Sequence, residues 1–376
     1  MKTRRVLLVG IFALIAGLAR AEPGVTDREV VVGQFAAFTG AAGQLGLRMK
    51  AGMEAHFKAV NAQGGVNGRQ IKLVGRDDGY EPEKAKVAVK ALIEEDKVFA
   101  LIGSVGTPTG LAALPILTAA NVPIVGMFTG AQALREPFNR NVFHVRASYF
   151  DETERIVQHL TTLGITKIGV FYQNDAYGKA GLEGVERALA KRKLKMVATG
   201  TVERNTTDVS KARDALLAAG PEAIVQVSAY KSCAAFIKEA RAKGYGGQFF
   251  NVSFVGSKAL ADELGDAGNG VVISQVVPFP YIPSSAVVRE YQQRMAELGD
   301  KELDFSSLEG FLTAKVFVEG LKRAGKNPTR ESLITGLESM REVNLGGFII
   351  NYGPKNHMGS SFTDLTIVGK GGKFVR

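Results

Sequence analysis

The chain has 376 residues and carries 47 Lys and Arg against 37 Asp and Glu, a formal charge of +10. Its 45% hydrophobic and 22% charged residues are ordinary globular values, which excludes a disordered, collagen-like or coiled-coil chain. The length suits two domains better than one core. Because the basic residues are spread along the chain without interleaved aromatic residues, we expect no nucleic-acid partner.

The first 21 residues are typical of a cleavable secretory signal peptide. Basic residues precede an apolar run at 6–18, and Ala21 stands before the expected cleavage site. The run is too short to span a bilayer stably, and no Cys follows it that could carry a lipid. We therefore expect an exported, free protein, with an uncleaved anchor as the alternative. Cleavage would remove four basic residues with the signal peptide and lower the formal charge of the remaining chain from +10 to +6.

Short β-branched runs then alternate with amphipathic segments, the pattern of βα units in parallel sheets. The first series predicts strands at 30–35, 70–75, 99–102, 122–125 and 142–145, with helices at 46–62, 82–95 and 109–120. The second series predicts helices at 152–163, 176–192, 209–219, 232–243 and 257–264, with strands at 167–172, 195–201, 223–227, 248–252 and 270–276. This predicts an α/β protein with two doubly wound, Rossmann-like lobes.

The last hundred residues do not begin a third lobe. Three prolines between 278 and 283 interrupt the pattern, and the segments that follow predict helices at 286–298, 308–324 and 329–339, then strands at 348–351 and 362–368. We expect the helices to return to the first lobe, so that three crossings form a hinge. The predicted domains are residues 22–146 with 278–357 for lobe 1, and 147–277 with 358–376 for lobe 2.

Motifs for catalysis, cofactors or metals are missing. The sequence has no G-x-G-x-x-G, Walker or G-x-S-x-G motif, and its four histidines do not cluster. Cys233, the single cysteine, cannot form an intramolecular disulfide and suits a buried position on a predicted helix. We expect no enzyme, no cofactor and no metal, with a catalytic triad assembled from distant residues as the open alternative.

Two threonines stand at the carboxyl ends of predicted strands. Strand 99–102 leads to Thr107, which we expect to cap the next helix, and strand 122–125 leads to Met127 and Thr129. If the strands are neighbours, the two hydroxyls and the helix N-terminal N–H groups could hold a carboxylate. The alternative is that both threonines are plain caps.

With these residues the sequence resembles the leucine/isoleucine/valine-binding type of periplasmic substrate-binding protein, the receptor of ABC importers. The resemblance covers nearly the whole chain after the leader and includes the segments 33–40, 61–68, 102–104, 174–178 and 239–244. It implies the type I periplasmic binding protein fold, in which two lobes close over a ligand. It also implies a periplasmic location, a monomer, and an ABC permease in the inner membrane as the partner.

The resemblance further implies which residues bind the ligand. Thr107 and Thr129 would hold a carboxylate, and the carbonyl of Met127 would accept a hydrogen bond from an ammonium. From the second lobe, Tyr177 and Tyr230 would close over the ligand, or serve as plain packing aromatics. The remaining contacts would come from Leu45, Gly106, Ser253 and Phe305.

The sequence departs from the family at the position expected to bind the ammonium. Ser253 stands where amino-acid binders place an acid, and a buried ammonium without a carboxylate partner is costly. The default ligand is a branched-chain or other aliphatic amino acid, with Glu309 as the replacement acid. The alternatives are an aromatic or aliphatic carboxylate without an α-amino group, or a ligand sensor of the same fold.

A second departure concerns a disulfide. Tyr80 and Gly106 stand where amino-acid binders carry paired cysteines. Since Gly106 and Leu45 are also smaller than their family counterparts, the pocket is expected to be roomier, and Phe38, Phe128 and Phe254 could line it.

Overall fold

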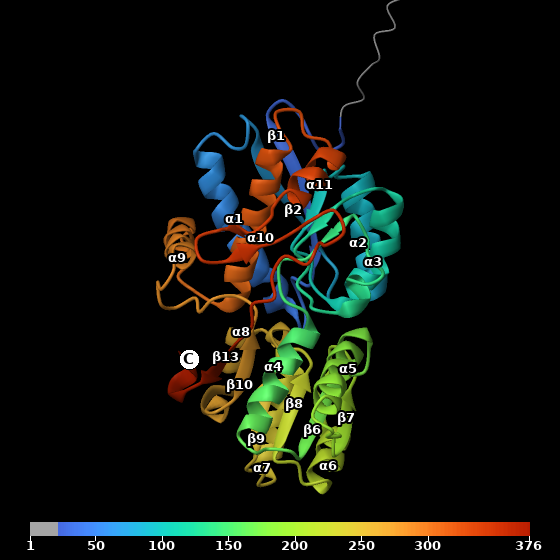
Figure 1. The fold of residues 1–376 in the computed structure, drawn as a ribbon, viewed down its shortest axis with the longest axis vertical. Helices are drawn as coiled ribbons and strands as arrows, with labels where there is room; N and C mark the ends of the chain where they lie inside the picture. Colours follow the sequence, from blue (N-terminus) through green and yellow to red (C-terminus); the bar gives the residue numbers. More distant parts are fainter. Residues whose placement is uncertain (1–21) are drawn as a thin grey trace, which may run out of the picture.

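Two β-sheets form the cores of the two lobes in Figure 1. The computed structural model describes residues 22–376, so the predicted signal peptide lies outside the described residues. The strand order is β2-β1-β3-β4-β5 in the first sheet and β14-β13-β10-β9-β8-β6-β7 in the second. All pairs in the first sheet are parallel, whereas β13 pairs antiparallel with β10 and β14. The predicted α/β class with two doubly wound lobes is confirmed.

The first sheet carries helices on both faces in Figure 1, as is usual for a parallel sheet. Its strands are β1 (Glu29–Ala36), β2 (Gln70–Asp77), β3 (Ala100–Ile102), β4 (Ile124–Val125) and β5 (Val142–Phe143). Its helices are α1 (Gly43–Ala62), α2 (Pro82–Glu94), α3 (Thr107–Ala119), α9 (Ala286–Leu298), α10 (Phe305–Arg323) and α11 (Arg330–Glu338), with the short 3₁₀ helix η1 (Gln132–Leu134). A separate ribbon pairs β11 (Val343–Asn344) with β12 (Ile349–Ile350).

The second sheet is built in the same way and closes with the end of the chain. Its strands are β6 (Ile168–Gln173), β7 (Ala198–Val202), β8 (Ala223–Val227), β9 (Gln248–Asn251), β10 (Val272–Gln275), β13 (Asp364–Val368) and β14 (Phe374–Val375). Its helices are α4 (Tyr149–Thr162), α5 (Ala176–Ala190), α6 (Ser210–Ala218), α7 (Tyr230–Ala242) and α8 (Ser257–Leu264). Short 3₁₀ turns are η2 (Ser253–Val255), η3 (Gly265–Gly268) and η4 (Lys370–Gly372).

The helices after residue 285 return to the first lobe, as predicted. Helix α10 lies along α1 in Figure 1, and glycines permit the close approach. A Cβ atom on Gly52 of α1 would lie 1.8 Å from the carbonyl oxygen of Ser307, and one on Gly310 would lie 2.0 Å from that of Met49. Such distances are sterically forbidden, so only glycine allows this packing.

Three chain segments connect the two lobes: residues 144–148, 276–285 and 351–363. The first and third are tied together, because the N–H of His144 donates to the carbonyl of His357 at 2.9 Å and the N–H of Gly359 donates to the carbonyl of His144 at 2.8 Å. These crossings form the predicted three-segment hinge. The exact domain boundaries stay a prediction.

Several helices begin two or three residues before the predicted start, among them α1, α3, α4, α7 and α10, and the caps of two of them show why. Helix α3 begins at Thr107 itself, and its N-cap is Gly106, whose φ of 108° suits glycine, so the expectation that Thr107 caps this helix was wrong. Helix α4 begins at Tyr149, three residues before the predicted start. There Ser148 and Asp151 form a reciprocal capping box that satisfies the first N–H groups.

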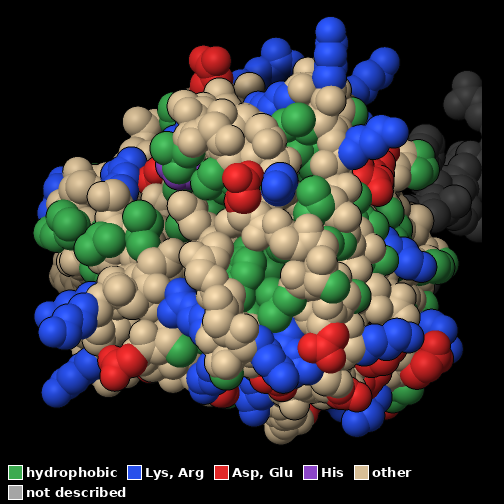
Figure 2. All heavy atoms as spheres, turned by 90° about the horizontal axis from the view of Figure 1, so that it is seen from below, with side chains coloured by type: hydrophobic (Ala, Val, Ile, Leu, Met, Phe, Trp, Pro, Cys, Tyr) green, Lys and Arg blue, Asp and Glu red, His purple; other side chains and the backbone are tan. Residues whose placement is uncertain are grey.

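The face of the molecule shown in Figure 2 is not covered by charges of one sign. Basic side chains there are interspersed with acidic ones around the rim. Within residues 22–376, no helix is both long and apolar enough to cross a membrane.

Candidate functional site

The carboxyl ends of β3 and β4 bring two threonine hydroxyls together. The strands pair in parallel, as the site prediction required, and Thr107 Oγ1 lies 2.6 Å from Thr129 Oγ1. The Thr129 hydroxyl also lies 3.3 Å from the hydroxyl of Tyr149, the first residue of α4. Both threonines are completely buried. The pair therefore presents hydroxyl groups next to the N-terminus of α3, where an anion is favoured.

Gly106 and Met127 lie within two residues of the two threonines in the chain. A Cβ atom on Gly106 would lie 2.4 Å from a ring carbon of Tyr80. The two positions expected to replace paired cysteines are therefore adjacent, and the Tyr80 ring fills the space. The carbonyl of Met127 accepts the N–H of Thr129 at 2.8 Å, which leaves it one further lone pair.

A cluster of aromatic rings from both sides of the hinge lies beside the threonines. Tyr177 and Phe254 have centroids 4.4 Å apart, Phe128 and Phe254 are 5.5 Å apart, and Tyr149 and Tyr177 are 5.4 Å apart. All four are at most 1% exposed. Such rings suit an apolar or planar ligand body, with the hydroxyls at one end as the polar anchor.

A buried charged cluster surrounds Ser253, and sequence reasoning missed most of it. Arg146 donates through Nη2 to the hydroxyl of Ser253 and to Glu152 Oε1, the latter at 3.2 Å. Glu152 also accepts the N–H of Ser253 at 2.7 Å and the hydroxyl of Ser274 at 2.5 Å. Glu309, the replacement acid considered from the sequence, lies 3.6 Å from Arg146 Nε. Two acids therefore converge near Ser253, but both share one arginine.

Burial dominates the protonation of this cluster. It raises the pKa of Glu309 to about 7, an effect that Arg146 opposes and Glu152 reinforces. Burial lowers the pKa of Arg146, but Glu309 and Glu152 more than offset this, so the arginine stays charged. No group of three or more His, Cys, Asp or Glu side chains suited to a metal occurs within the described part of the chain. The cluster can bind and orient a polar ligand.

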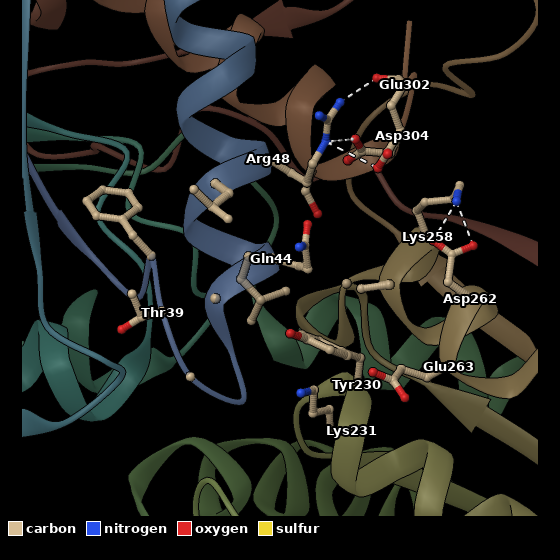
Figure 3. A pocket seen from close by; sticks show the side chains of 18 residues that line it. Thr39, Gln44, Arg48, Tyr230, Lys231, Lys258, Asp262, Glu263, Glu302 and Asp304 are labelled. Atoms are coloured by element: carbon tan, nitrogen blue, oxygen red, sulfur yellow. Dashed lines mark hydrogen bonds and ion pairs between the residues drawn. The ribbon is translucent and has the colours of Figure 1, made fainter. Parts of the chain in front are cut away.

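The other predicted residues lie apart from this centre. Leu45 and Tyr230 line a pocket of about 620 Å³ between the lobes, formed by α1, α7, α8 and the start of α10. In Figure 3, Tyr230 points from α7 toward Gln44 of α1. Arg48, on the wall above, pairs with Asp304 at 2.6 Å.

Two of the expected phenylalanines also lie outside the centre. Phe38 lines the same pocket as Leu45. Phe305 instead packs against an aromatic group near the C-terminus, with centroid distances of 5.9 Å to Phe279, 5.9 Å to Tyr281 and 5.6 Å to Phe374. The structure therefore brings Gly106, Thr107, Met127, Thr129, Tyr177 and Ser253 into the buried centre, and places Leu45, Tyr230 and Phe305 around it.

The lobes touch each other across the cleft. Arg204 of the second lobe pairs with Glu81 of the first at 2.7 Å, and Asn205 donates to the carbonyl of Gly79 at 3.1 Å. A Cβ atom on Gly256 would meet Leu45 of the facing lobe at 2.5 Å. Two hinged α/β lobes closed over a buried polar and aromatic centre define a two-lobed binding protein.

Comparisons with known proteins give the family. Residues 29–373 match the model of the periplasmic binding proteins. Leu/Ile/Val-binding protein homolog 7 of Brucella suis is 25% identical over 340 residues, 85% of this chain and 82% of that protein. The chain belongs to the periplasmic binding protein family, in its leucine/isoleucine/valine-binding type, and this is a family of substrate-binding proteins.

Solved structures agree with this assignment. A possible leucine/isoleucine/valine-binding protein from Rhodopirellula baltica has a TM-score of 0.89 at 34% identity, covering 93% of this chain and 97% of that one. A substrate-binding periplasmic protein from Ralstonia solanacearum has a TM-score of 0.88 at 34% identity, covering 92% of this chain and 99% of that one. The predicted type I periplasmic binding protein fold is thereby confirmed.

Proposed function

We propose that this chain is the extracytoplasmic solute-binding protein of an ABC transporter, and that it captures a small carboxylate by closing its lobes. The observation that carries the proposal is the buried Thr107–Thr129 hydroxyl pair, 2.6 Å apart at the N-terminus of α3. A carboxylate oxygen there would accept both hydroxyls and gain from the helix dipole. In this proposal the protein is exported, acts as a monomer, and delivers its ligand to a permease in the inner membrane.

The default ligand in this proposal is a branched-chain or other aliphatic amino acid. The printed names of the relatives, Leu/Ile/Val-binding proteins, support it. In this form of the proposal the Met127 carbonyl and Glu309 receive the ammonium. Glu309 supports this form of the proposal, because it is buried and lies 3.6 Å from Arg146 Nε without a hydrogen bond to that nitrogen.

A specific observation favours the second candidate, a carboxylate without an α-amino group. Ser253 is already occupied by Arg146 and Glu152, and both oxygens of Glu152 accept hydrogen bonds from protein donors. An ammonium placed at Ser253 would therefore meet a guanidinium before it met a free carboxylate. The aromatic rings around the site also suit a planar acid.

Thermal unfolding with matched ligand pairs tests the proposal. A ligand that binds the folded state stabilises it and so raises the melting temperature. The stabilisation is about 2.7 kcal/mol when the ligand concentration is about a hundred times Kd. The pairs are leucine with 4-methylpentanoate and phenylalanine with 3-phenylpropionate. A rise with any of these acids supports carboxylate capture, and the member of each pair that acts identifies the ligand class. Flat melting curves with the whole series would refute the proposed function.

A further inference from the structure

Arg146 has hydrogen-bond donors that the protein does not use. It is 1% exposed and its guanidinium lies 4.9 Å from the centroid of Phe128, the residue before Thr129. Nη2 is bonded to Ser253 and Glu152, but Nη1 and Nε have no hydrogen-bond partner within residues 22–376. Buried donors are nearly always paired, and an unpaired donor on a charged group is strongly unfavourable.

The position of Arg146 connects it to the predicted ligand site from two sides. Through Nη2 it touches Ser253, which stands where the family resemblance places the partner of an ammonium. Through its flat face it covers Phe128 and lies 6.0 Å from the ring centroid of Tyr149, whose hydroxyl meets Thr129. The chain thus has a guanidinium, paired with Glu152, beside the serine that stands where the resemblance places an acid.

The neighbouring charges do not use the remaining donors. The two carboxylate oxygens of Glu152 accept hydrogen bonds from Ser253, Ser274 and Nη2 of Arg146. Glu309 is near Nε at 3.6 Å, beyond hydrogen-bond distance, and does not reach Nη1. Nη1 therefore offers two N–H groups to an acceptor that comes from outside the chain.

We propose that Arg146 is a ligand-binding residue, and that it selects a carboxylic acid carrying an oxygen acceptor where an amino acid carries its ammonium. A 2-oxo or 2-hydroxy acid has this chemistry. Its carboxylate would accept the hydroxyls of Thr107 and Thr129, and its second oxygen would accept Nη1 of Arg146. This inference rests on the proposed function and names the substrate class of the same site.

Three acids that share one carbon skeleton separate the possibilities. Titration calorimetry of the purified protein is run with 4-methyl-2-oxopentanoate, 4-methylpentanoate and leucine, and again with phenylpyruvate, 3-phenylpropionate and phenylalanine. Calorimetry suits this chain because it has no Trp for fluorescence. A charge-assisted hydrogen bond predicts that the 2-oxo acid binds about 10- to 100-fold tighter than the plain acid, and the amino acid weakest.

Two variants then assign that preference to Arg146. Arg146→Met should abolish the advantage of the 2-oxo acid over the plain acid while the plain acid still binds. Arg146→Lys keeps the charge opposite Glu152 but lacks the fork of donors, so it should fold as the wild type and lose most of the advantage. The matched control is Arg187→Met, because the exposed Arg187 covers the ring of Phe150 at 4.5 Å on the outside of the second lobe.

The outcomes are distinct. A 2-oxo preference that disappears in both Arg146 variants and survives in the Arg187 variant supports the inference. A wild-type preference for the amino acid, or a 2-oxo preference that persists in Arg146→Lys, overturns it while carboxylate capture stands. If no acid of either series binds the wild type, the proposed function and this inference fall together.

Discussion

Replacing Glu309 by Gln should change how the stability of this protein depends on pH. Glu309 is 3% exposed, and burial raises the pKa of its carboxyl group to about 7. Arg146 and Arg135 oppose this effect and Glu152 adds to it. The unfolded chain, by contrast, ionises a glutamate at about 4.3.

The sign follows from the number of protons that each state binds. Between these two pKa values the folded state holds the Glu309 proton and the unfolded state does not, so the contribution to stability is complete below about pH 4 and is lost as the pH rises through about 7. At about 1.4 kcal/mol for each pKa unit, the full loss amounts to about 4 kcal/mol, of which about 3 kcal/mol falls between about pH 4.5 and 8.5. Glutamine has nearly the same shape and does not titrate, so the variant should not show this loss.

Urea unfolding followed by far-ultraviolet circular dichroism between pH 4.5 and 8.5 measures the effect. The difference in unfolding free energy between Glu309→Gln and wild type should grow by about 3 kcal/mol across this range, because contributions from all other groups cancel. Glu183→Gln, on the exposed face of α5, is the matched control and should follow the wild type. Parallel curves for Glu309→Gln and wild type would mean that the buried carboxyl is already ionised, and the burial argument would fail.

Three further predictions follow from single contacts. Thr129→Val should weaken carboxylate binding about 10- to 100-fold by calorimetry, whereas the exposed Thr201→Val should not; equal affinities would remove Thr129 from the site. His56→Phe should make the protein less sensitive to acid, because burial lowers the pKa of His56 to about 3, whereas the unfolded histidine takes up its proton below about pH 6.5. The wild type therefore loses up to about 1.4 kcal/mol of stability per pH unit as the pH falls through that range. Melting curves that show equal acid sensitivity for the variant and the wild type would contradict this. Arg204→Gln breaks the ion pair with Glu81 across the cleft. The two side chains are 23% and 39% exposed, so the pair contributes only about 0.2 to 1 kcal/mol to the closed form. Ligand affinity should fall about fivefold at most, and a larger loss would indicate a direct contact between Arg204 and the ligand.

Periodicity predicted the fold well because each helix and strand buries one continuous set of apolar residues. The return of α9, α10 and α11 to the first lobe followed from the prolines that interrupt the second series. Helix ends were less accurate, since they depend on single residues. Ser148 with Asp151 starts α4 early, and the positive φ of Gly106 starts α3 at Thr107. The capping box at Ser148 was visible in the sequence and could have been used.

The contacts within the candidate site were predictable where neighbouring strands determine them and not where distant segments meet. Thr107 and Thr129 follow adjacent strands, so their contact could be inferred from sheet order alone. The charged cluster joins Arg146, Glu152 and Glu309, which come from a hinge crossing and two helices of different lobes. A single sequence does not show which of its many charged side chains point inward. One available signal was that Arg146 directly follows the predicted apolar strand at 142–145.

In the proposed function, the same cluster would couple ligand binding to closure of the lobes. Glu309 lies on α10 of the first lobe, Ser253 belongs to the second lobe, and Arg146 stands on the crossing between them. Opening the lobes must therefore separate the guanidinium from at least one of these partners. A ligand gains the contacts of Arg146 and both lobes together only in the closed form, and a ligand stabilises a conformation only by such a difference in contacts. Ligands that leave Nη1 of Arg146 unpaired should consequently close the protein less completely than ligands that satisfy it.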